Sequence, residues 1–237
     1  MRIPRQVFFM IGLVFVIPIG AAEICGSLSG TLTLAESPYT ATCDISVGSG
    51  DTLTIEPGVE IRFYAGTALQ VDGTLTAWGS SSAPIVFTSA EASPAAGDWD
   101  KILVNGSATI HEAVFRYAGI GIRDSGSAYL DVADSSFRFN HFGIHTWYSN
   151  GTQCHSVSEC EFSDNDQAGM LINYTKSNFV VSDCSFQRNG VPIHMDYESC
   201  PTLSGLTVGE SNQYCNCVQT GTNYTESITL TSPGIPY

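Results

Sequence analysis

Apolar residues recur along the chain in short alternating runs, separated by glycine, proline and polar turns. In the N-terminal half, Leu53-Thr54-Ile55 and Leu75-Thr76-Ala77 lie 22 residues apart, and Ile61-Arg62-Phe63 and Ile85-Val86-Phe87 lie 24 residues apart. Alternation with a period of two is typical of a strand with one buried face. No segment keeps the 3.6-residue period of a capped helix, so the pattern predicts short strands, with helix only as a short terminal cap.

The C-terminal half repeats a second motif with a similar period. Its four phenylalanines, Phe115, Phe137, Phe162 and Phe186, are separated by 22, 25 and 24 residues. Each phenylalanine follows a small residue by two positions and is followed about seven positions later by a second large apolar residue. The small residues are Ala113, Ser135, Cys160 and Cys184, and the large apolar residues are Ile122, Ile144, Met170 and Ile193.

A fixed period of this length indicates stacked structural units rather than a single folded-in core. Strands that recur every 22–25 residues can pair in register only if each circuit returns to its own column, one strand spacing higher. The sequence therefore predicts an all-β fold, a single-stranded right-handed parallel β-helix of about eight coils. The repeated phenylalanines should form an inward column. An asparagine three residues after a phenylalanine is expected to form a hydrogen-bonded ladder at a bend, at Asn140, Asn165 and Asn189.

The repeat resembles that of the right-handed parallel β-helix proteins, the pectin-lyase-like superfamily. The resemblance covers the chain from about Cys43 to Leu230 and includes the Gly-Ile pairs Gly121-Ile122 and Gly143-Ile144. It implies the fold and no particular activity. The Asn-Thr-Asp, Asp-Asp, Gly-His-Gly and Arg-x-Lys elements of polygalacturonases in that superfamily do not occur in this sequence.

The N-terminus has the features of a secretory signal peptide over residues 1–22. Two arginines precede an uncharged run from Val7 to Ile19, and small residues follow it. We expect an N-terminal capping segment over 23–43, the β-helix over 44–230, and a tail over 231–237. The apolar run is shorter than the ~20 residues that cross a bilayer, so no membrane span is expected in the mature chain.

The charge balance restricts the partners. The chain has a formal net charge of −14, and without Arg2 and Arg5 it has seven basic and 23 acidic residues. Such a chain repels phosphate backbones, so nucleic-acid binding is not expected. Cations or neutral polymers are the more natural partners.

The cysteines indicate an oxidising compartment. All eight lie beyond the predicted signal peptide, and disulfides form in secreted and periplasmic proteins. Cys25 and Cys43 are expected to form a disulfide, and Cys200 with Cys215 or Cys217 is the second expected pairing. A zinc site at Cys215 and Cys217 is disfavoured, because only one residue separates them and no matching pair exists. The chain is therefore expected outside the cell, at the cell surface or in a periplasm.

Acidic residues also recur in register, each three positions before its phenylalanine. Adjacent carboxylates would lie ~5 Å apart on a β-helix, and three interpretations remain open. The column is simply solvated, it collects a hard cation such as Ca²⁺ through oxygen ligands, or it supplies the acid and base of a glycoside-cleaving enzyme. The four residues are Glu112, Asp134, Glu159 and Asp183.

An aromatic register follows the second apolar column. Rings at a rise of ~5 Å beside amide and carboxylate groups suit a polysaccharide, whose sugar faces stack on aromatic rings. The alternative is that the tyrosines close a turn and shield the edge of the core. The candidate ligand-binding residues are Trp147, Tyr148, Asn173, Tyr174, Asp196 and Tyr197.

The histidines do not predict a metal site. His145 and His194 are separated by the coil that carries Leu171, and two strand spacings are too far for a shared ion. His111, His141 and His155 are expected at turns or on the surface.

Taken together, the sequence predicts a secreted, non-catalytic β-helix protein. It would bind extracellular polysaccharide or another cell-surface component, or serve as a structural or adhesive surface module. The alternative is a carbohydrate-active enzyme, a polysaccharide lyase or glycoside hydrolase, that uses the acidic column. No cofactor is expected apart from calcium at that column, and the sequence leaves the oligomeric state open.

Overall fold

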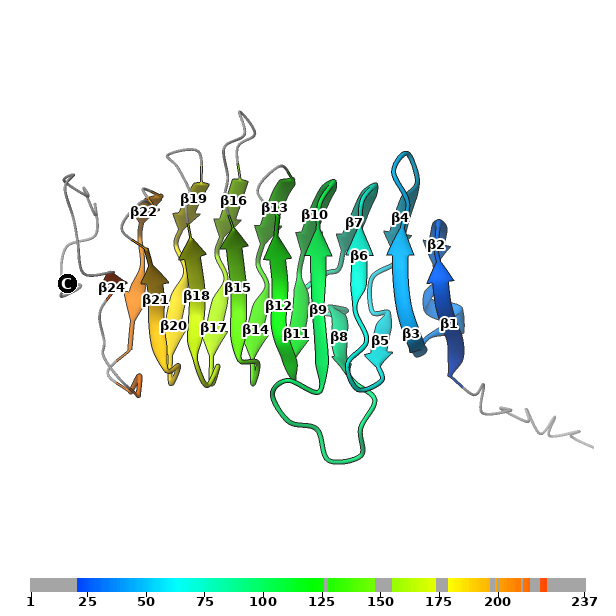
Figure 1. Ribbon diagram of the computed structural model, residues 1–237, viewed down its shortest axis with the longest axis horizontal. Coiled ribbons are helices and arrows are strands. Elements are labelled where there is room, and N and C mark those ends of the chain that lie inside the picture. The colour runs from blue at the N-terminus through cyan, green and yellow to red at the C-terminus, as the bar shows by residue number, and fades with distance from the viewer. Residues whose placement is uncertain are drawn as a thin grey trace, which may run out of the picture.

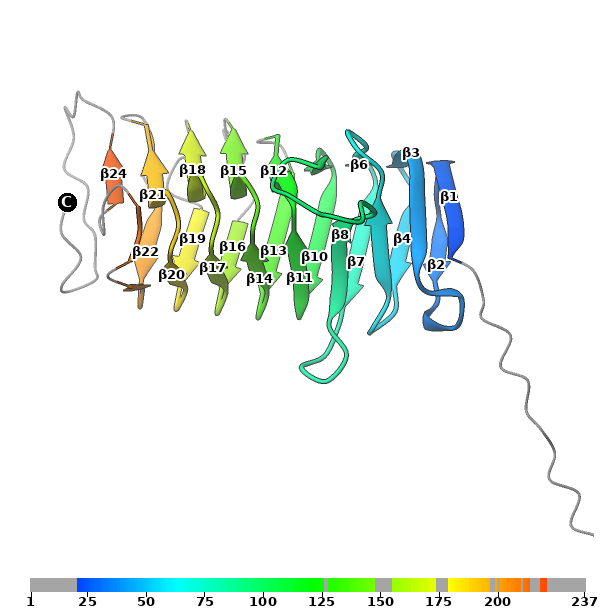
Figure 2. The ribbon, with the colours of Figure 1, turned by 90° about the horizontal axis from the view of Figure 1, so that it is seen from below.

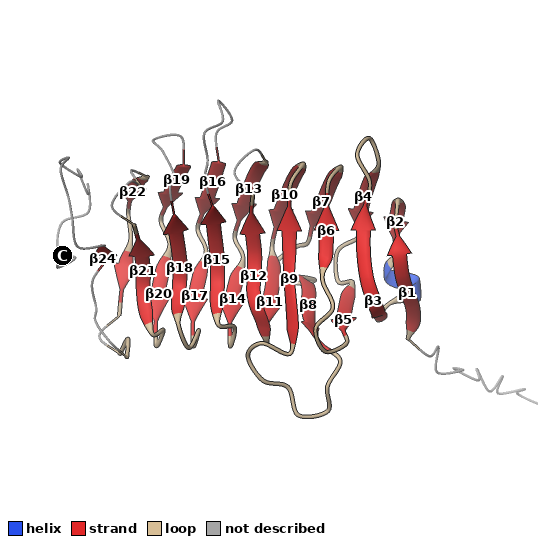
Figure 3. Cartoon of the chain, in the orientation of Figure 1, coloured by secondary structure: helices blue, strands red, loops and turns tan. Residues whose placement is uncertain are grey.

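The computed structural model is a parallel β-solenoid of about seven turns, close to the eight coils expected. Strands of successive turns lie side by side along the long axis (Figure 1). The single helical element is the short 3-10 helix η1 (Leu34–Glu36), near the N-terminal end (Figure 3), within the part of the chain that is described. The described residues are 21–125, 128–147, 155–173, 179–196, 199, 201–209 and 211–213, with the backbone of 218–220.

The strands form three faces, each with one strand per turn. The first face is an eight-stranded parallel sheet. Its strands are β2 (Gly30–Leu32), β4 (Thr52–Ile55), β7 (Thr74–Trp78), β10 (Ser107–His111), β13 (Tyr129–Ala133), β16 (His155–Ser158), β19 (Phe179–Ser182) and β22 (Thr202–Ser204).

The second face follows the first in each turn. Its strands are short, because the chain bends sharply on both sides of them. They are β5 (Glu60–Phe63), β8 (Ile85–Ser89), β11 (Ala113–Arg116), β14 (Ser136–Arg138), β17 (Glu161–Ser163), β20 (Ser185–Gln187) and β23 (Thr207–Val208).

The third face completes each turn, and several of its strands lie side by side in Figure 2. The long strand β3 (Tyr39–Val47) pairs with both the second and the third face and joins them into one sixteen-stranded sheet. Strand β1 (Ala22–Ser27) pairs with β3 at the N-terminal end. The other third-face strands are β6 (Leu69–Val71), β9 (Trp99–Val104), β12 (Ala118–Asp124), β15 (Phe142–Trp147), β18 (Ala168–Asn173), β21 (Val191–Met195) and β24 (Val218–Thr220).

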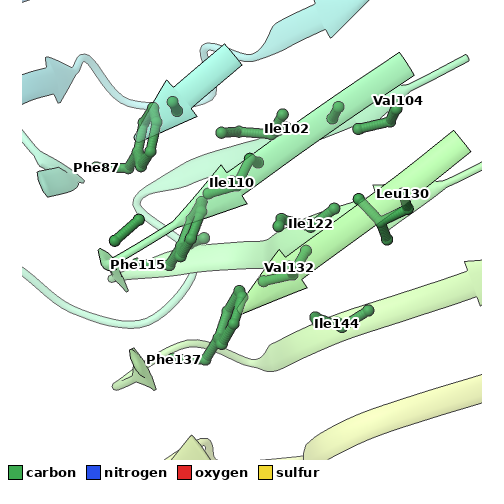
Figure 4. Close-up of a cluster of buried hydrophobic side chains, with 14 of the residues drawn as sticks. Phe87, Ile102, Val104, Ile110, Phe115, Ile122, Leu130, Val132, Phe137 and Ile144 are labelled. Carbon is green, nitrogen blue, oxygen red and sulfur yellow. The ribbon is translucent and has the colours of Figure 1, made fainter. Parts of the chain in front are cut away.

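Phenylalanine rings form a continuous column inside the solenoid. Neighbouring rings are stacked, with centroids 4.6–5.0 Å apart and interplanar angles of 3–12°. This spacing equals the separation of about 4.7–4.9 Å between paired strands, so each ring lies over its equivalent in the next turn (Figure 4). The column extends the four expected members by one and consists of Phe87, Phe115, Phe137, Phe162 and Phe186, all fully buried.

A second apolar column on the third face packs beside these rings. Ile122, Ile144, Met170 and Ile193 pair in register and are fully buried. The residue before the first three is glycine, and the phenylalanine rings pass close to it; Pro192 precedes Ile193. A Cβ atom at Gly143 would lie 2.5 Å from the carbonyl oxygen of Gly169 and 2.7 Å from the ring of Phe162. The repeated Gly-Ile pair is therefore a packing requirement of the stack.

Buried asparagines form the expected ladder where the second face bends into the third. The Asn140 side chain donates from Nδ2 to Asn165 Oδ1 over 3.0 Å, and Asn165 donates in turn to Asn189 Oδ1 over 2.8 Å. The same Oδ1 atoms accept backbone N–H groups of the preceding turn, for example Asn140 N at 3.1 Å. Asn212 adds a fourth member that the sequence analysis did not include, accepting from Asn189 N at 2.9 Å. The ladder thus satisfies the polar backbone of a buried bend.

Both bends that flank the short second-face strands use the left-handed backbone region. The bend before each strand carries an acidic residue with φ of 50–54°, and the bend after it carries a second non-glycine residue with φ of 54–67°. Aspartate and asparagine tolerate this region better than most side chains. The first set is Glu112, Asp134, Glu159 and Asp183, and the second is Tyr117, Phe139, Asp164 and Arg188.

The cysteines within the described residues are of two kinds. Cys25 and Cys43 form the expected disulfide, which joins β1 to β3. Cys160 and Cys184 are free and buried in adjacent turns, and each thiol donates to the backbone carbonyl oxygen two residues earlier. The hydrogen bond with Cys184 and burial both raise the pKa of the Cys160 thiol, whereas the same hydrogen bond lowers the pKa of Cys184. The second expected pairing, Cys200 with Cys215 or Cys217, lies outside the described residues.

The N-terminal register differs from the one expected. Leu53 pairs with Leu75 as expected, but Ile61 lies opposite Phe87 rather than Ile85. Ala77 to Phe87 spans ten positions where the paired Ile55 to Ile61 spans six, so this turn holds four extra residues rather than the two expected. A shift of two keeps the inward and outward alternation of a strand unchanged, so the hydrophobic pattern did not distinguish the two alignments.

The prediction that His155 lies at a turn or on the surface is wrong. His155 is fully buried at the start of β16, and its Nδ1 lies 3.4 Å from Oδ2 of the equally buried Asp124. Its ring also packs at 6.0 Å from that of Phe179. His155 is the first residue of an alternating strand and faces the same inward side as Val157.

Among the described residues, no helix has the length and apolar character that crossing a bilayer requires.

Candidate functional site

An open groove crosses the outer surface of the third face over β15, β18 and β21. Its volume is about 620 Å³, within the range of small-molecule and sugar sites. Phe142, Ala168 and Val191 occupy the same register position in three successive turns. The depression forms because the small Ala168 side chain lies between two larger ones. Leu171 and His194, which also pair in register, form the opposite side.

The rim of the groove is polar and lies at the bend that precedes β18. Asp166 and Gln167 line it, and both are exposed. The Asp166 carboxylate lies 2.9 Å from Nδ1 of His141, one turn away. The Gln167 side-chain amide has no protein hydrogen bond within the described residues, so it is available to a ligand. The groove therefore combines an apolar floor with a polar rim.

An exposed aromatic side chain lies at the other end of β15. Trp147 is 43% exposed and pairs in register with Asn173 of the next turn. Asp196 follows in the turn after, where its backbone N donates to Ile172 O and its carboxylate accepts from Ser199 Oγ at 2.6 Å. These three expected ligand-binding residues thus share one row at the edge of the third face. The tyrosines of the predicted strip, Tyr148, Tyr174 and Tyr197, lie outside the described residues.

His145 lies beneath this surface between the groove and Trp147. Its ring contacts those of Phe142 and Trp147, at 6.2 and 5.9 Å between centroids. Asn173 Nδ2 lies 3.3 Å from Nε2 of His145, and because an amide nitrogen only donates, Nε2 accepts and the ring is neutral. Burial, with a smaller contribution from Arg123 in the adjacent turn, lowers the pKa of His145 to about 4.

This lowered pKa predicts a loss of stability in mild acid. In the unfolded chain His145 binds a proton below pH ~6.5, whereas in the folded chain it stays neutral down to about pH 4. Between these values the unfolded state binds more protons, so the free energy of unfolding falls as the pH falls, by roughly 3 kcal/mol in total. Urea unfolding of the wild type and His145→Leu at pH 7 and pH 4.5 measures this difference, since leucine occupies the same row in the next turn.

The matched variant for this pH dependence is Arg123→Gln. This substitution removes the positive charge that makes the smaller contribution to the lowered pKa. The pKa of His145 is therefore expected to rise, but to stay below its value in the unfolded chain. An imidazole NMR titration of the folded wild type with a midpoint near 6.5 would contradict the assignment.

The acidic column lies elsewhere, at the bends between the first and second faces. Asp134, Glu159 and Asp183 are exposed and Glu112 is half-buried. None of the four carboxylates makes an ion pair or hydrogen bond within the described residues. No group of three or more His, Cys, Asp or Glu side chains in this part of the chain is placed to hold a metal ion. Their left-handed backbone explains their recurrence as bend residues, and calcium binding or catalysis at these positions stays a prediction.

Comparison with known families agrees with this architecture. Residues 26–141 match the family described as a pectate-lyase-like β-helix domain, and residues 96–230 match the right-handed β-helix region. The chain belongs to the right-handed β-helix family. Membership of this β-helix family establishes the fold and leaves the ligand open, because function depends on the particular side chains of a site.

One curated relative is similar to part of this chain. Protein bark beetle of Drosophila melanogaster is 47% identical over 58 residues, which are 24% of this chain and 2% of that protein. The chain therefore spans only a small fraction of that relative's length. No solved structure matches the chain.

The groove itself was not predicted from the sequence. Side chains that repeat from turn to turn can be recognised in the sequence, whereas the groove depends on a change in side-chain size at one register position. Its one sequence signal is the run Phe142, Ala168, Val191, which can be compared only after the register of the turns is known.

Proposed function

We propose that this β-helix protein is an exported, non-catalytic module that binds extracellular glycan through its third face. The observation that carries the proposal is the open groove beside the exposed Trp147 and its neighbour Asn173. Aromatic and apolar surfaces stack on sugar rings, while amides and carboxylates bond to hydroxyl groups. A rigid parallel sheet holds these groups at a fixed spacing that suits a repeating polymer.

Export is supported by the disulfide and by the N-terminal sequence. The bond between Cys25 and Cys43 needs an oxidising environment. The charged start, apolar run and small residues of 1–22 have the composition of a cleaved signal. The acidic net charge favours a neutral or cationic polymer over an anionic one.

A binding role is proposed in preference to catalysis because the acidic column has a structural explanation. Glu112, Asp134, Glu159 and Asp183 occupy left-handed bends that every turn of this type needs. Those bends and the groove border different strands, since the acidic bends lead into the second face. A carbohydrate-active enzyme that uses the column remains the alternative, and its signature would be turnover of the polysaccharide.

Replacing Trp147 by alanine is expected to weaken retention on insoluble polysaccharide by about tenfold, because it removes an exposed stacking surface. The matched control is Trp78→Ala. Trp78 is 56% exposed on the first face, where it stacks on His111 at 5.7 Å. Partition of each purified variant between solution and a panel of insoluble polysaccharides measures the effect.

Three outcomes would count against the proposal. The panel retains no protein, or both tryptophan variants lose retention equally, or the polysaccharide is cleaved and shorter chains or unsaturated ends are released. The last outcome would support the enzymatic alternative, and Glu159→Gln would then test the acidic column.

A further inference from the structure

The groove on the third face has a more specific chemistry than a general sugar site. Its floor at Ala168 is apolar, and so are its sides at Val191 and the half-buried Leu171. A sugar that presents only hydroxyl groups would leave them unpaired against such a floor, which costs free energy. The floor therefore favours a ligand with a small apolar substituent.

The rim adds a requirement for hydrogen bonding to a neutral group. The exposed Gln167 side chain carries one acceptor and two donor positions, and its amide has no protein partner within the described residues. Asp166 is the charged residue of the groove, and His141 lies against its carboxylate at 2.9 Å. An amide on the ligand would match the Gln167 amide, accepting one hydrogen bond and donating another.

The acidic charge of the chain excludes anionic glycans. The chain carries 23 acidic against nine basic residues, and no lysine or arginine lines the groove. Sugars that carry carboxylate or sulfate groups would be repelled and would find no cationic partner there. The ligand unit is therefore not anionic.

We propose that the groove binds an N-acetylated amino-sugar unit of an extracellular glycan. The acetyl methyl group would pack on Ala168, Leu171 and Val191, and the amide would pair with the Gln167 side chain. The Phe142 ring provides the apolar wall against the sugar ring. This assignment rests on the proposed glycan-binding function and gives it a substrate class.

Calorimetry with soluble trisaccharides of one linkage tests the assignment. The N-acetylglucosamine trimer is expected to bind about tenfold more tightly than the glucose trimer, from burial of the methyl group and the amide hydrogen bonds. The glucosamine trimer, which lacks the acetyl group and is cationic, separates acetyl recognition from attraction to the acidic surface. Tighter binding of the glucosamine trimer, or equal binding of the glucose trimer, would overturn the proposal.

Substitutions of groove residues test whether the trimer binds in the groove. Leu171→Asn and Gln167→Ala are each expected to reduce affinity for the N-acetylglucosamine trimer by about tenfold. Val180→Asn is the matched control, because Val180 is a half-buried outward residue of β19 on the first face. Circular dichroism melting curves of all variants report whether the fold is kept. An unchanged affinity in both groove variants would overturn the proposal.

The two proposals fail in different ways. Suppose that polysaccharides without N-acetyl groups are retained and that Trp147→Ala abolishes this retention. That result would support the glycan-binding function and contradict the N-acetyl assignment. If the wild-type protein binds no glycan of any class, both the glycan-binding function and the N-acetyl assignment are contradicted.

Discussion

Replacing Phe162 by alanine is expected to lower the free energy of unfolding by about 3–5 kcal/mol, the range for truncating a buried phenylalanine. Phe162 is fully buried, with ring neighbours at 5.0 and 4.9 Å above and below. Because the flanking strands are held by their own pairing, the column cannot collapse to fill the gap. Chemical denaturation followed by far-ultraviolet circular dichroism measures the loss.

The matched control is Phe139→Ala, two residues after the column position of its own turn. Phe139 is 43% exposed and its ring lies 5.8 Å from that of Tyr117. Its removal is expected to cost well under 1 kcal/mol, as for most surface substitutions. Equal losses in the two variants would mean that the inward column does not dominate stability.

Replacing Asn165 by alanine is expected to destabilise the protein by about 4 kcal/mol. Its fully buried side chain makes four hydrogen bonds: Oδ1 accepts from the backbone N and Nδ2 of Asn140, and Nδ2 donates to Phe137 O and Asn189 Oδ1. Alanine removes all four hydrogen bonds, at roughly 1 kcal/mol each, and takes from the buried Asn140 N and Phe137 O the partner that Asn165 supplies. Thermal unfolding and the urea midpoint both report this change.

Asn105→Ala serves as the control for the ladder. Asn105 is half-buried and donates one side-chain hydrogen bond, to Asp72 Oδ1 at 2.7 Å. A loss of about 1 kcal/mol is expected there. If Asn165→Ala were no more damaging than Asn105→Ala, the ladder would be a passive consequence of the bends rather than a source of stability.

The columns could be predicted from sequence because stacking repeats the same environment in every turn. A buried position between two phenylalanine rings favours a third ring, which stacks on both. A buried bend with unpaired backbone groups favours asparagine, whose amide hydrogen-bonds to them. The fold class was therefore visible in the spacing of Phe115, Phe137, Phe162 and Phe186, and the structure confirms it.

Features that break the repeat could not be predicted in this way. Asn212 was missed because Val208 replaces the phenylalanine of its turn and precedes the asparagine by four residues instead of three. The pairing of Ile61 with Phe87 was missed because an even shift leaves the alternation intact. The burial of His155 depends on Asp124, a partner on another face that local sequence does not reveal.

The groove of the candidate site is also a feature that breaks the repeat. Trp147 and Asn173 were predicted from their register, and the structure pairs them. The groove required knowledge of which side chains lie side by side in successive turns, since its depth comes from Ala168 between Phe142 and Val191. A binding site on a solenoid is thus a local exception to the repeat.

The disulfide at the N-terminal end protects that end of the solenoid against opening. Each turn contacts only its neighbours, so a stack of this kind can lose structure one turn at a time from an end. The covalent link between Cys25 and Cys43 holds β1 against β3 and prevents the first strand from peeling away. Under tension or heat, the first strand would therefore stay on the stack until this bond is reduced.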